Sequence, residues 1–221
     1  AVTLAVVAVS AAPSNAENSD ESLIEETIVR GSYLQSSEVS ALRTPTPILD
    51  VPQSLSIVTS EEILRRGFTS VSDIIEYLPG VSMSQGEGHR DAVVFRGVRS
   101  TADFFIDGVR DDVQYYRPLY NLEQLEVLRG PNALLFGRGG TGGILNRVTK
   151  KANTGENFSQ LTGYADSFGA GGLQADFNVG LSDTVAFRVN AMAEGLDNHR
   201  DHSDGERVGV NPTARVLLSE G

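Results

Sequence analysis

The chain has 221 residues, a formal net charge of −11 and no cysteine. The length gives room for one or two domains with a full hydrophobic core. The negative charge argues against a nucleic-acid partner, because phosphate binding needs a basic surface. The absence of cysteine from the sequence excludes disulfides, thiolate metal sites and a cysteine nucleophile within this chain.

Residues 1–16, AVTLAVVAVSAAPSNA, form an apolar run followed by small residues. This pattern is typical of the hydrophobic part and cleavage region of a secretory signal peptide, and the run is too short to cross a bilayer as a helix. We therefore expect residues 1–16 to be a partial signal peptide of an exported protein, with a buried core strand or helix as the alternative. Since no other segment is apolar enough for a transmembrane helix, membrane insertion would have to use β-strands.

Residues 17–43 are acidic and serine-rich, which is typical of a flexible segment. Within it, Glu26, Thr27, Ile28 and Val29 form a short stretch with β-branched side chains. An extended peptide of this kind can pair with the edge of a partner's sheet through backbone hydrogen bonds. Taken alone, however, the pattern is more typical of a linker.

The segment from Thr44 to Gly80 predicts a strand and two short helices. Residues 44–52 contain three prolines and must be extended, and residues 53–59 alternate apolar and polar side chains as a strand does. Ser60 and two glutamates begin a helix that Gly67 ends. A second helix, with apolar residues at helical spacing, lies between Thr69 and the Pro79-Gly80 pair. This order predicts a small mixed α/β core.

Residues 81–91 are polar and predict an exposed loop, and residues 92–98 predict a strand interrupted at Gly97. Residues 104–113 contain two short strands joined by Asp107-Gly108, which is a strong hairpin signal. Residues 122–128 fit a short helix or a strand.

The stretch from Asn121 to Lys150 is the most glycine-rich part of the sequence. Two apolar runs, Leu125–Leu128 and Ile144–Val148, flank a connection with six glycines and a proline, which predicts strand, turn and strand. Gly137–Gly142 matches the G-x-G-x-x-G pattern of a dinucleotide-binding turn, but no helical pattern follows it, so we reject a nucleotide site. Glycines at this density indicate that backbone approaches backbone closely.

From Glu156 onward, segments of about ten residues alternate apolar and strongly polar side chains, as the strands of a transmembrane β-barrel do. A soluble sandwich is the alternative. His199, Asp201, His202 and Asp204 lie in a polar run between two such segments, which an exposed loop explains better than a metal site. We predict no catalytic residue, no metal site and no enzymatic activity.

Four motifs, taken in order, resemble one family. They are LPGV (Leu78–Val81), FRG (Phe95–Gly97), FFIDGVRDD (Phe104–Asp112) and LEVLRGPNALLFGRGGTGGILNRVTKK (Leu125–Lys151). Together they look like the plug domain of TonB-dependent outer-membrane receptors, and most of all like the siderophore receptors of Gram-negative bacteria. The resemblance implies an α+β plug domain at residues 44–151, a small mixed sheet with short helices. The first antiparallel strands of a truncated transmembrane β-barrel would follow at residues 152–221.

The resemblance also implies the function and the partners. The protein would take up ferric siderophores across the cell outer membrane, with lipid around the barrel and the plug blocking its lumen. Residues 26–29 then look like the TonB box, which pairs with TonB in the periplasm, and residues 17–43 become a flexible segment that carries it. No cofactor is implied, because ferric iron enters only as part of the bound siderophore.

Residues 82–91 and 112–120 would be the apical loops of such a plug. The aromatic and polar side chains there suit an iron chelate whose metal is already fully ligated, and we expect ligand contacts from Gln85, His89, Arg90, Tyr115 and Tyr116. Alternatively, the two tyrosines pack the plug against the barrel. Arg96, Glu126 and Arg129 fit structural, partly buried charges with partners between plug and barrel.

The length departs from the family. The 70 residues after Lys151 have room for about four strands, which predicts an N-terminal fragment of a longer receptor or a truncated product. A soluble periplasmic binding or adhesion module that reuses a plug-like fold is the alternative function.

Overall fold

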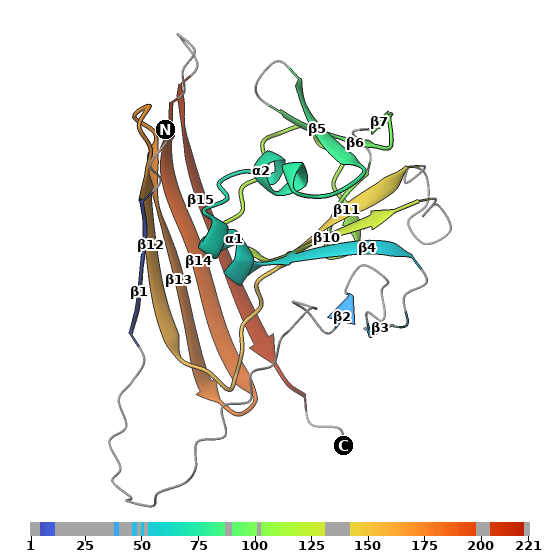
Figure 1. The fold of residues 1–221 in the computed structure, drawn as a ribbon. Helices are drawn as coiled ribbons and strands as arrows, with labels where there is room; N and C mark the ends of the chain where they lie inside the picture. Colours follow the sequence, from blue (N-terminus) through green and yellow to red (C-terminus); the bar gives the residue numbers. More distant parts are fainter. Residues whose placement is uncertain are drawn as a thin grey trace, which may run out of the picture.

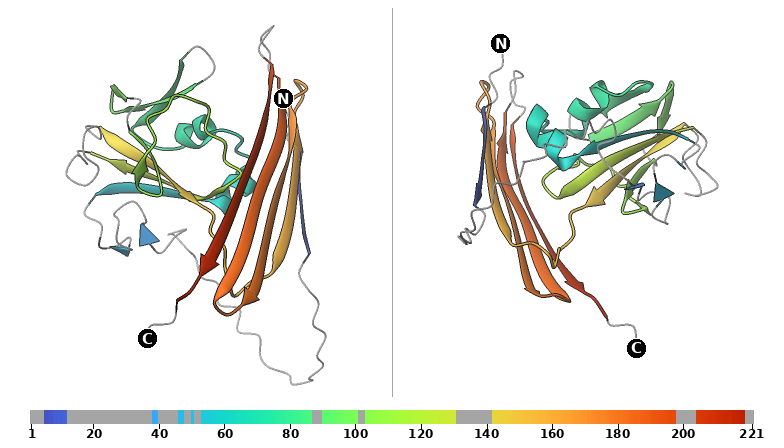
Figure 2. Two further views of the ribbon diagram at one scale, coloured as in Figure 1. Left: turned by 180° about the vertical axis from the view of Figure 1, so that it is seen from behind. Right: turned by 60° about the horizontal axis from the view of Figure 1, so that its bottom comes forward.

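The described residues form a mixed α+β domain and a curved antiparallel sheet beside it (Figure 1, Figure 2). The computed structural model describes residues 5–11, 38–39, 46–47, 50, 53–86, 90–100, 103–130, 142–197 and 204–218. We call the elements from β4 (Ser54–Thr59) to β11 (Gly143–Thr149) the mixed domain, and the strands from β12 (Phe158–Ala165) to β15 (Gly205–Val216) the wall. The predicted fold class, a small mixed sheet with short helices followed by antiparallel strands, is confirmed.

The mixed domain is built on a five-stranded sheet. In spatial order its strands are β4, β10 (Leu122–Arg129), β11, β8 (Phe104–Ile106) and β9 (Val109–Arg110). Neighbouring strands are antiparallel, except β8 and β11, which run parallel. The predicted turn at Asp107-Gly108 joins β8 to β9, and both turn residues have the positive φ angles that such a turn requires. The glycine-rich stretch begins and ends in paired strands, β10 and β11, as predicted.

The two predicted helices are present, and local capping explains their bounds. Helix α1 (Ser60–Arg66) begins where the Thr59 hydroxyl accepts a bond from the backbone of its first turn, and it ends at Gly67 in the left-handed conformation. Helix α2 (Val71–Glu76) begins with a capping box formed by Ser70 and Asp73. The buried faces of both helices pack onto the core of the mixed domain.

Residues 81–86 and 90–91, which the sequence predicts as part of an exposed loop, instead belong to a second sheet. Strand β5 (Val81–Gly86) pairs with β6 (Arg90–Phe95), which pairs in turn with β7 (Val98–Ser100). The loop prediction is wrong here because Val81 and Met83 pack against the core. A serine follows each of them, so the segment contains too few apolar residues to be recognised as a strand. The predicted interruption at Gly97 is the β6–β7 turn, where Arg96 and Gly97 have positive φ angles.

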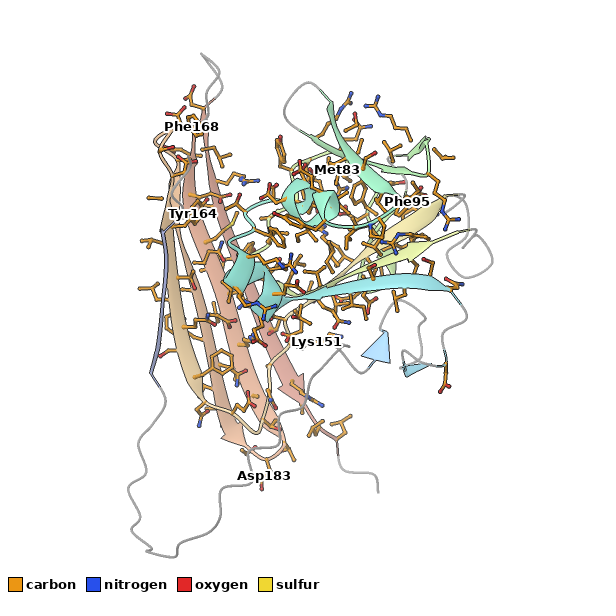
Figure 3. All side chains as sticks on the ribbon, viewed as in Figure 1. Met83, Phe95, Lys151, Tyr164, Phe168 and Asp183 are labelled. Atoms are coloured by element: carbon orange, nitrogen blue, oxygen red, sulfur yellow. The ribbon has the colours of Figure 1, made fainter. Side chains whose placement is uncertain are left out.

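The core of the mixed domain lies between its helices and its two sheets. Figure 3 shows the side chains crowded there, with Met83 and Phe95 labelled. The fully buried members come from α2, β6, β8, β10 and β11 and are Val71, Ile74, Ile75, Val93, Phe95, Phe104, Leu125, Val127 and Leu145. The mixed domain therefore has its own hydrophobic core.

The wall consists of β12, β13 (Gly171–Ser182), β14 (Val185–Leu196) and β15, each antiparallel to its neighbour. One face carries exposed apolar side chains, among them Leu161, Leu173, Phe177, Phe187 and Val210. The other face carries polar side chains that are buried against the mixed domain, among them Thr162, Asp176, Asn178 and Asn190. Alternation with the apolar side outward is the pattern of a barrel strand rather than of a soluble sandwich, whose inner faces are apolar.

Residues 5–11, part of the predicted signal peptide, form strand β1 (Ala5–Ala11) along the outer edge of β12. A second isolated pair joins β2 (Glu38–Val39) to β3 (Thr46–Pro47). The signal peptide and the domain limits at residues 16, 43 and 151 remain predictions. Among the described residues, no helix combines the length and apolarity needed to cross a membrane.

Candidate functional site

The structure describes only some of the predicted site residues in full. Residues 26–29 and His89 lie outside the described residues, and Gln85 is described only as a backbone position of β5. Arg90, Tyr115 and Tyr116 are described in full. They come from the start of β6 and from the loop between β9 and β10, which we call the 111–120 loop.

The structure brings these two segments together. A guanidinium nitrogen of Arg90 donates to the side-chain oxygen of Gln114. The backbone N–H of Asp91 donates to the carbonyl of Tyr115 over 3.3 Å. Strand β6 and the 111–120 loop therefore present one continuous surface.

Arg117 occupies the centre of the 111–120 loop, and the sequence analysis did not single it out. Its guanidinium is buried and lies 3.6 Å from the centre of the Phe104 ring. It donates to the carbonyl oxygens of Asp111 (3.1 Å), Val113 (2.7 Å) and Tyr115 (3.2 Å). Burial lowers the pKa of Arg117, and the charge of Asp111 opposes this effect.

The Asp111 carboxylate joins this loop to strand β11. One of its oxygens accepts from the Tyr115 hydroxyl (2.8 Å), from Arg147 (2.6 Å) and from Arg117 (3.3 Å). The Tyr115 hydroxyl also accepts from Arg147, at 2.6 Å. Burial raises the pKa of Tyr115, while the charge of Arg147 lowers it. The phenol therefore stays neutral, and its hydroxyl both donates a hydrogen bond to Asp111 and accepts one from Arg147.

Asp91 completes the cluster from β6. It accepts from the backbone N–H of Arg117 at 2.9 Å, and it is almost completely buried. Burial raises the pKa of the Asp91 carboxyl, although the bond from Arg117 and its charge act in the opposite direction. No local sequence pattern predicts this cluster, because its members lie up to 56 positions apart, from Asp91 to Arg147.

The two tyrosines have different surroundings. The Tyr115 ring lies beside Arg117 and Arg147, inside the mixed domain. The Tyr116 ring lies 5.7 Å from the guanidinium of Arg207, on strand β15 of the wall. Tyr115 therefore lies within the mixed domain and Tyr116 lies next to the wall. Ligand contact by either tyrosine remains a prediction.

Charged side chains connect the mixed domain to the wall where the chain passes from one to the other, near Lys151 (Figure 3). The Lys150 ammonium lies 2.9 Å from Asp176 of β13. Arg188 of β14 donates to both oxygens of Asp176, at 2.8 Å each, and lies 3.6 Å from Glu123. Of the charges expected between plug and barrel, Glu126 bonds to Asn146 and Arg129 to Ser56, both within the mixed domain, and Arg96 is exposed.

Close packing explains several of the glycines that the structure describes. A Cβ on Gly142 would lie 2.7 Å from the Phe95 side chain, and one on Gly143 would lie 2.5 Å from the Leu128 carbonyl. Gly209 of the wall has the same role, because the Tyr120 hydroxyl lies 2.8 Å from the position of a Cβ there. The predicted close approach is confirmed at these positions, whereas residues 131–141 lie outside the description.

Two other kinds of site can be compared with this one. A small cavity of about 50 Å³ lies between α1 and the wall, beside Phe68, Tyr120 and Tyr164. In the described part of the chain, histidine, aspartate and glutamate side chains do not gather in a group that could hold a metal ion. The surface around the 111–120 loop is thus the strongest candidate for ligand binding.

Comparison with known proteins gives a consistent result. A family model described as "TonB-dependent Receptor Plug Domain" matches residues 47–144. Among curated relatives, the probable TonB-dependent receptor BfrD of Bordetella pertussis is 31% identical over 86% of this chain and 26% of the relative. The catecholate siderophore receptor Fiu of Escherichia coli K12 is 29% identical over 91% of this chain and 27% of the relative.

Solved structures agree with these relatives. The open form of the ferric-catecholate import receptor Fiu from E. coli K12 matches with a TM-score of 0.69 and 29% identity, over 76% of this chain and 25% of that one. The siderophore receptor PiuA from Acinetobacter baumannii matches with a TM-score of 0.70 and 26% identity, over 81% and 26%. The chain thus spans about a quarter of the length of the receptors it matches.

Proposed function

Because this chain carries the plug domain of a TonB-dependent receptor, followed by antiparallel strands of the early barrel region, we propose that the protein takes up ferric siderophores across the outer membrane. The mixed domain is hereafter the plug. TonB-dependent receptors of this kind are outer-membrane transport receptors of Gram-negative bacteria, not enzymes.

One observation carries the proposal beyond the family match. The wall turns its polar face to the plug and its apolar face outward, with Leu173 and Val210 more than half exposed. A sheet that hides polar groups and exposes apolar ones is unstable in water on both faces. Lipid on the outer face and a plug on the inner face remove that cost.

Ligand recognition would use the surface around the 111–120 loop. The proposed contacts are Gln85, His89, Arg90, Tyr115 and Tyr116, of which Arg90 and Tyr115 lie on segments that touch each other. Their amide, imidazole, guanidinium and phenol groups suit a chelate that already fills the coordination sphere of its iron. Ferric iron is therefore cargo within the siderophore, and we propose no cofactor of the protein itself.

Coupling to TonB would use residues 26–29. Their backbone would pair with a strand of TonB, so a residue without an N–H in that stretch should block the pairing. In the receptor expressed from its complete gene, Ile28→Pro should abolish iron-dependent growth and leave ligand binding at the cell surface intact. Uptake that survives this change would show that residues 26–29 are not the coupling segment.

The uptake itself can be tested in a Gram-negative host that lacks its own siderophore receptors. The complete gene should restore growth under iron restriction with ferric 2,3-dihydroxybenzoate or ferrichrome as the iron source, and only when the host has TonB. Recovery of the product as a stable soluble periplasmic protein that binds neither complex would overturn the proposal. It would support the alternative of a soluble binding or adhesion module.

A further inference from the structure

We propose that Arg117 is the positioning residue of the ligand surface: its buried guanidinium gathers the 111–120 loop and so presents Gln114 and Tyr116 to the ligand. The inference rests on the proposed function, and it concerns a residue that does not itself touch the ligand. Its basis is the number of loop groups that bond to this one side chain.

Residues 111–118 belong to no helix or strand, so no backbone ladder satisfies their carbonyl groups. The Arg117 guanidinium supplies the hydrogen bonds that neighbouring strands would otherwise provide. It accepts no bond and donates to the carbonyls of residues 111, 113 and 115, at 3.1, 2.7 and 3.2 Å. The loop backbone is thus wrapped around a cation that it supplies itself.

Arg117 is held by three further contacts, two at its guanidinium and one at its backbone. Phe104, which is fully buried, covers one face at 3.6 Å. Asp111 balances the charge, and Asp91 accepts from the backbone N–H of the same residue, at 2.9 Å. A planar group with five donors can satisfy this arrangement, whereas the three donors of a lysine ammonium cannot reach all of these acceptors at once.

In this arrangement Gln114, Tyr115 and Tyr116 have different roles. The Tyr115 hydroxyl is engaged by Asp111 and Arg147, so it holds the loop to strand β11. Gln114 is exposed and bonds to Arg90, and the Tyr116 ring lies on the side of the loop that meets the wall, beside Arg207. In this inference Tyr115, named above among the ligand contacts, anchors the loop instead, and Gln114 and Tyr116 contact the ligand.

The order of the loop can be measured without any ligand. In the complete receptor, Asp112→Cys would carry a nitroxide label at an exposed loop position. This chain has no cysteine of its own, so within it the label would attach only there. Cysteines elsewhere in the receptor would be replaced first. Arg117→Lys should sharpen the spectrum of the label through faster motion, and the matched change Arg110→Lys on strand β9 should not. A spectrum that Arg117→Lys leaves unchanged would overturn the inference.

The effect on binding is tested with ferric 2,3-dihydroxybenzoate and ferrichrome on receptor-containing membranes. Arg117→Lys should weaken binding about tenfold, as loss of a charged hydrogen bond does. In a Tyr116→Ala background the same change should have a clearly smaller effect, because only Gln114 is then left for the loop to present. Equal effects in both backgrounds, or none, would overturn the positioning role. Failure of the unchanged receptor to bind either complex would overturn the proposed function instead, and the label would still decide the role of Arg117.

Discussion

The plug and the wall use the same residue types in opposite ways. Val71 in the plug is fully buried, whereas Val208 in the wall is 80% exposed. Charged groups are also used differently, since the plug bonds Arg117 to its own loop and the wall bonds Arg188 and Asp176 to each other and to the plug. The plug is therefore organised around an apolar core, and the wall as a sheet with a polar face toward the plug and an apolar outer face.

The largest expected difference concerns apolar side chains. Leu125→Ala removes a fully buried plug side chain and should cost about 2 to 5 kcal/mol of stability. Leu173→Ala in the wall removes a side chain that is 58% exposed, and it should cost under about 1 kcal/mol. Thermal unfolding of the purified receptor in detergent measures both. Similar losses for the two variants would break the contrast between the parts.

The second difference concerns the outer face of the wall. Val210 lies near the middle of β15 and is 64% exposed, so in water Val210→Arg would be almost neutral. Against lipid the same change should cost about 2 to 4 kcal/mol. Asp183→Arg, at the β13–β14 turn labelled in Figure 3, is the control and should be close to neutral. The yield of folded receptor in membranes distinguishes the two environments.

The third test addresses the contact between plug and wall. Asp176→Asn leaves Lys150 and Arg188 without their shared carboxylate, and it should weaken this contact by about 1 to 3 kcal/mol. Faster hydrogen exchange is expected at the backbone of β10, near Glu123, while the interior of β6 should be unaffected. Uniform protection in β10 would mean that these ion pairs do not hold the plug.

The smallest effect concerns pH. Burial raises the pKa of Asp91 above its ordinary value of 3.8, so the folded state holds the proton more tightly than the unfolded state does. The contribution of Asp91 to stability is therefore full below that value and is lost as the pH rises through the raised pKa. Asp91→Asn should make the plug slightly more stable at neutral pH and should have no such effect in acid. Unfolding midpoints measured at several pH values test this, and a gain that persists in acid would contradict it.

Local signals predicted the parts of this fold that depend on neighbours in sequence. Capping residues gave α1 and α2, the Asp107-Gly108 pair gave the β8–β9 hairpin, and alternation gave the wall. Strand β5 was missed because its core-facing Val81 and Met83 are separated by serine, so the alternation contains too few apolar residues to be recognised.

The candidate site was predictable only in outline. The sequence pointed to the tyrosine pair, but it could not separate Tyr115 from Tyr116, because their roles depend on Arg147 and Arg207 from distant strands. Arg117 carried no signal, since an arginine before a proline in a loop is unremarkable without the carbonyls that surround it. Contacts of long sequence separation decide both cases.

The position of β4 at the edge of the plug sheet has a mechanical consequence. Its first residue, Ser54, pairs with Arg129 at the far end of β10, and the strand then runs back along β10 to Thr59. Tension that reaches the plug from residues preceding β4, where it pulls across the sheet, would load the Ser54 end first and break the strand bonds one at a time. The bond from Arg129 to Ser56 would be among the earliest to yield. Such peeling needs far less force than sliding a whole strand, so β4 would detach while the Lys150 contacts still tie β11 to the wall.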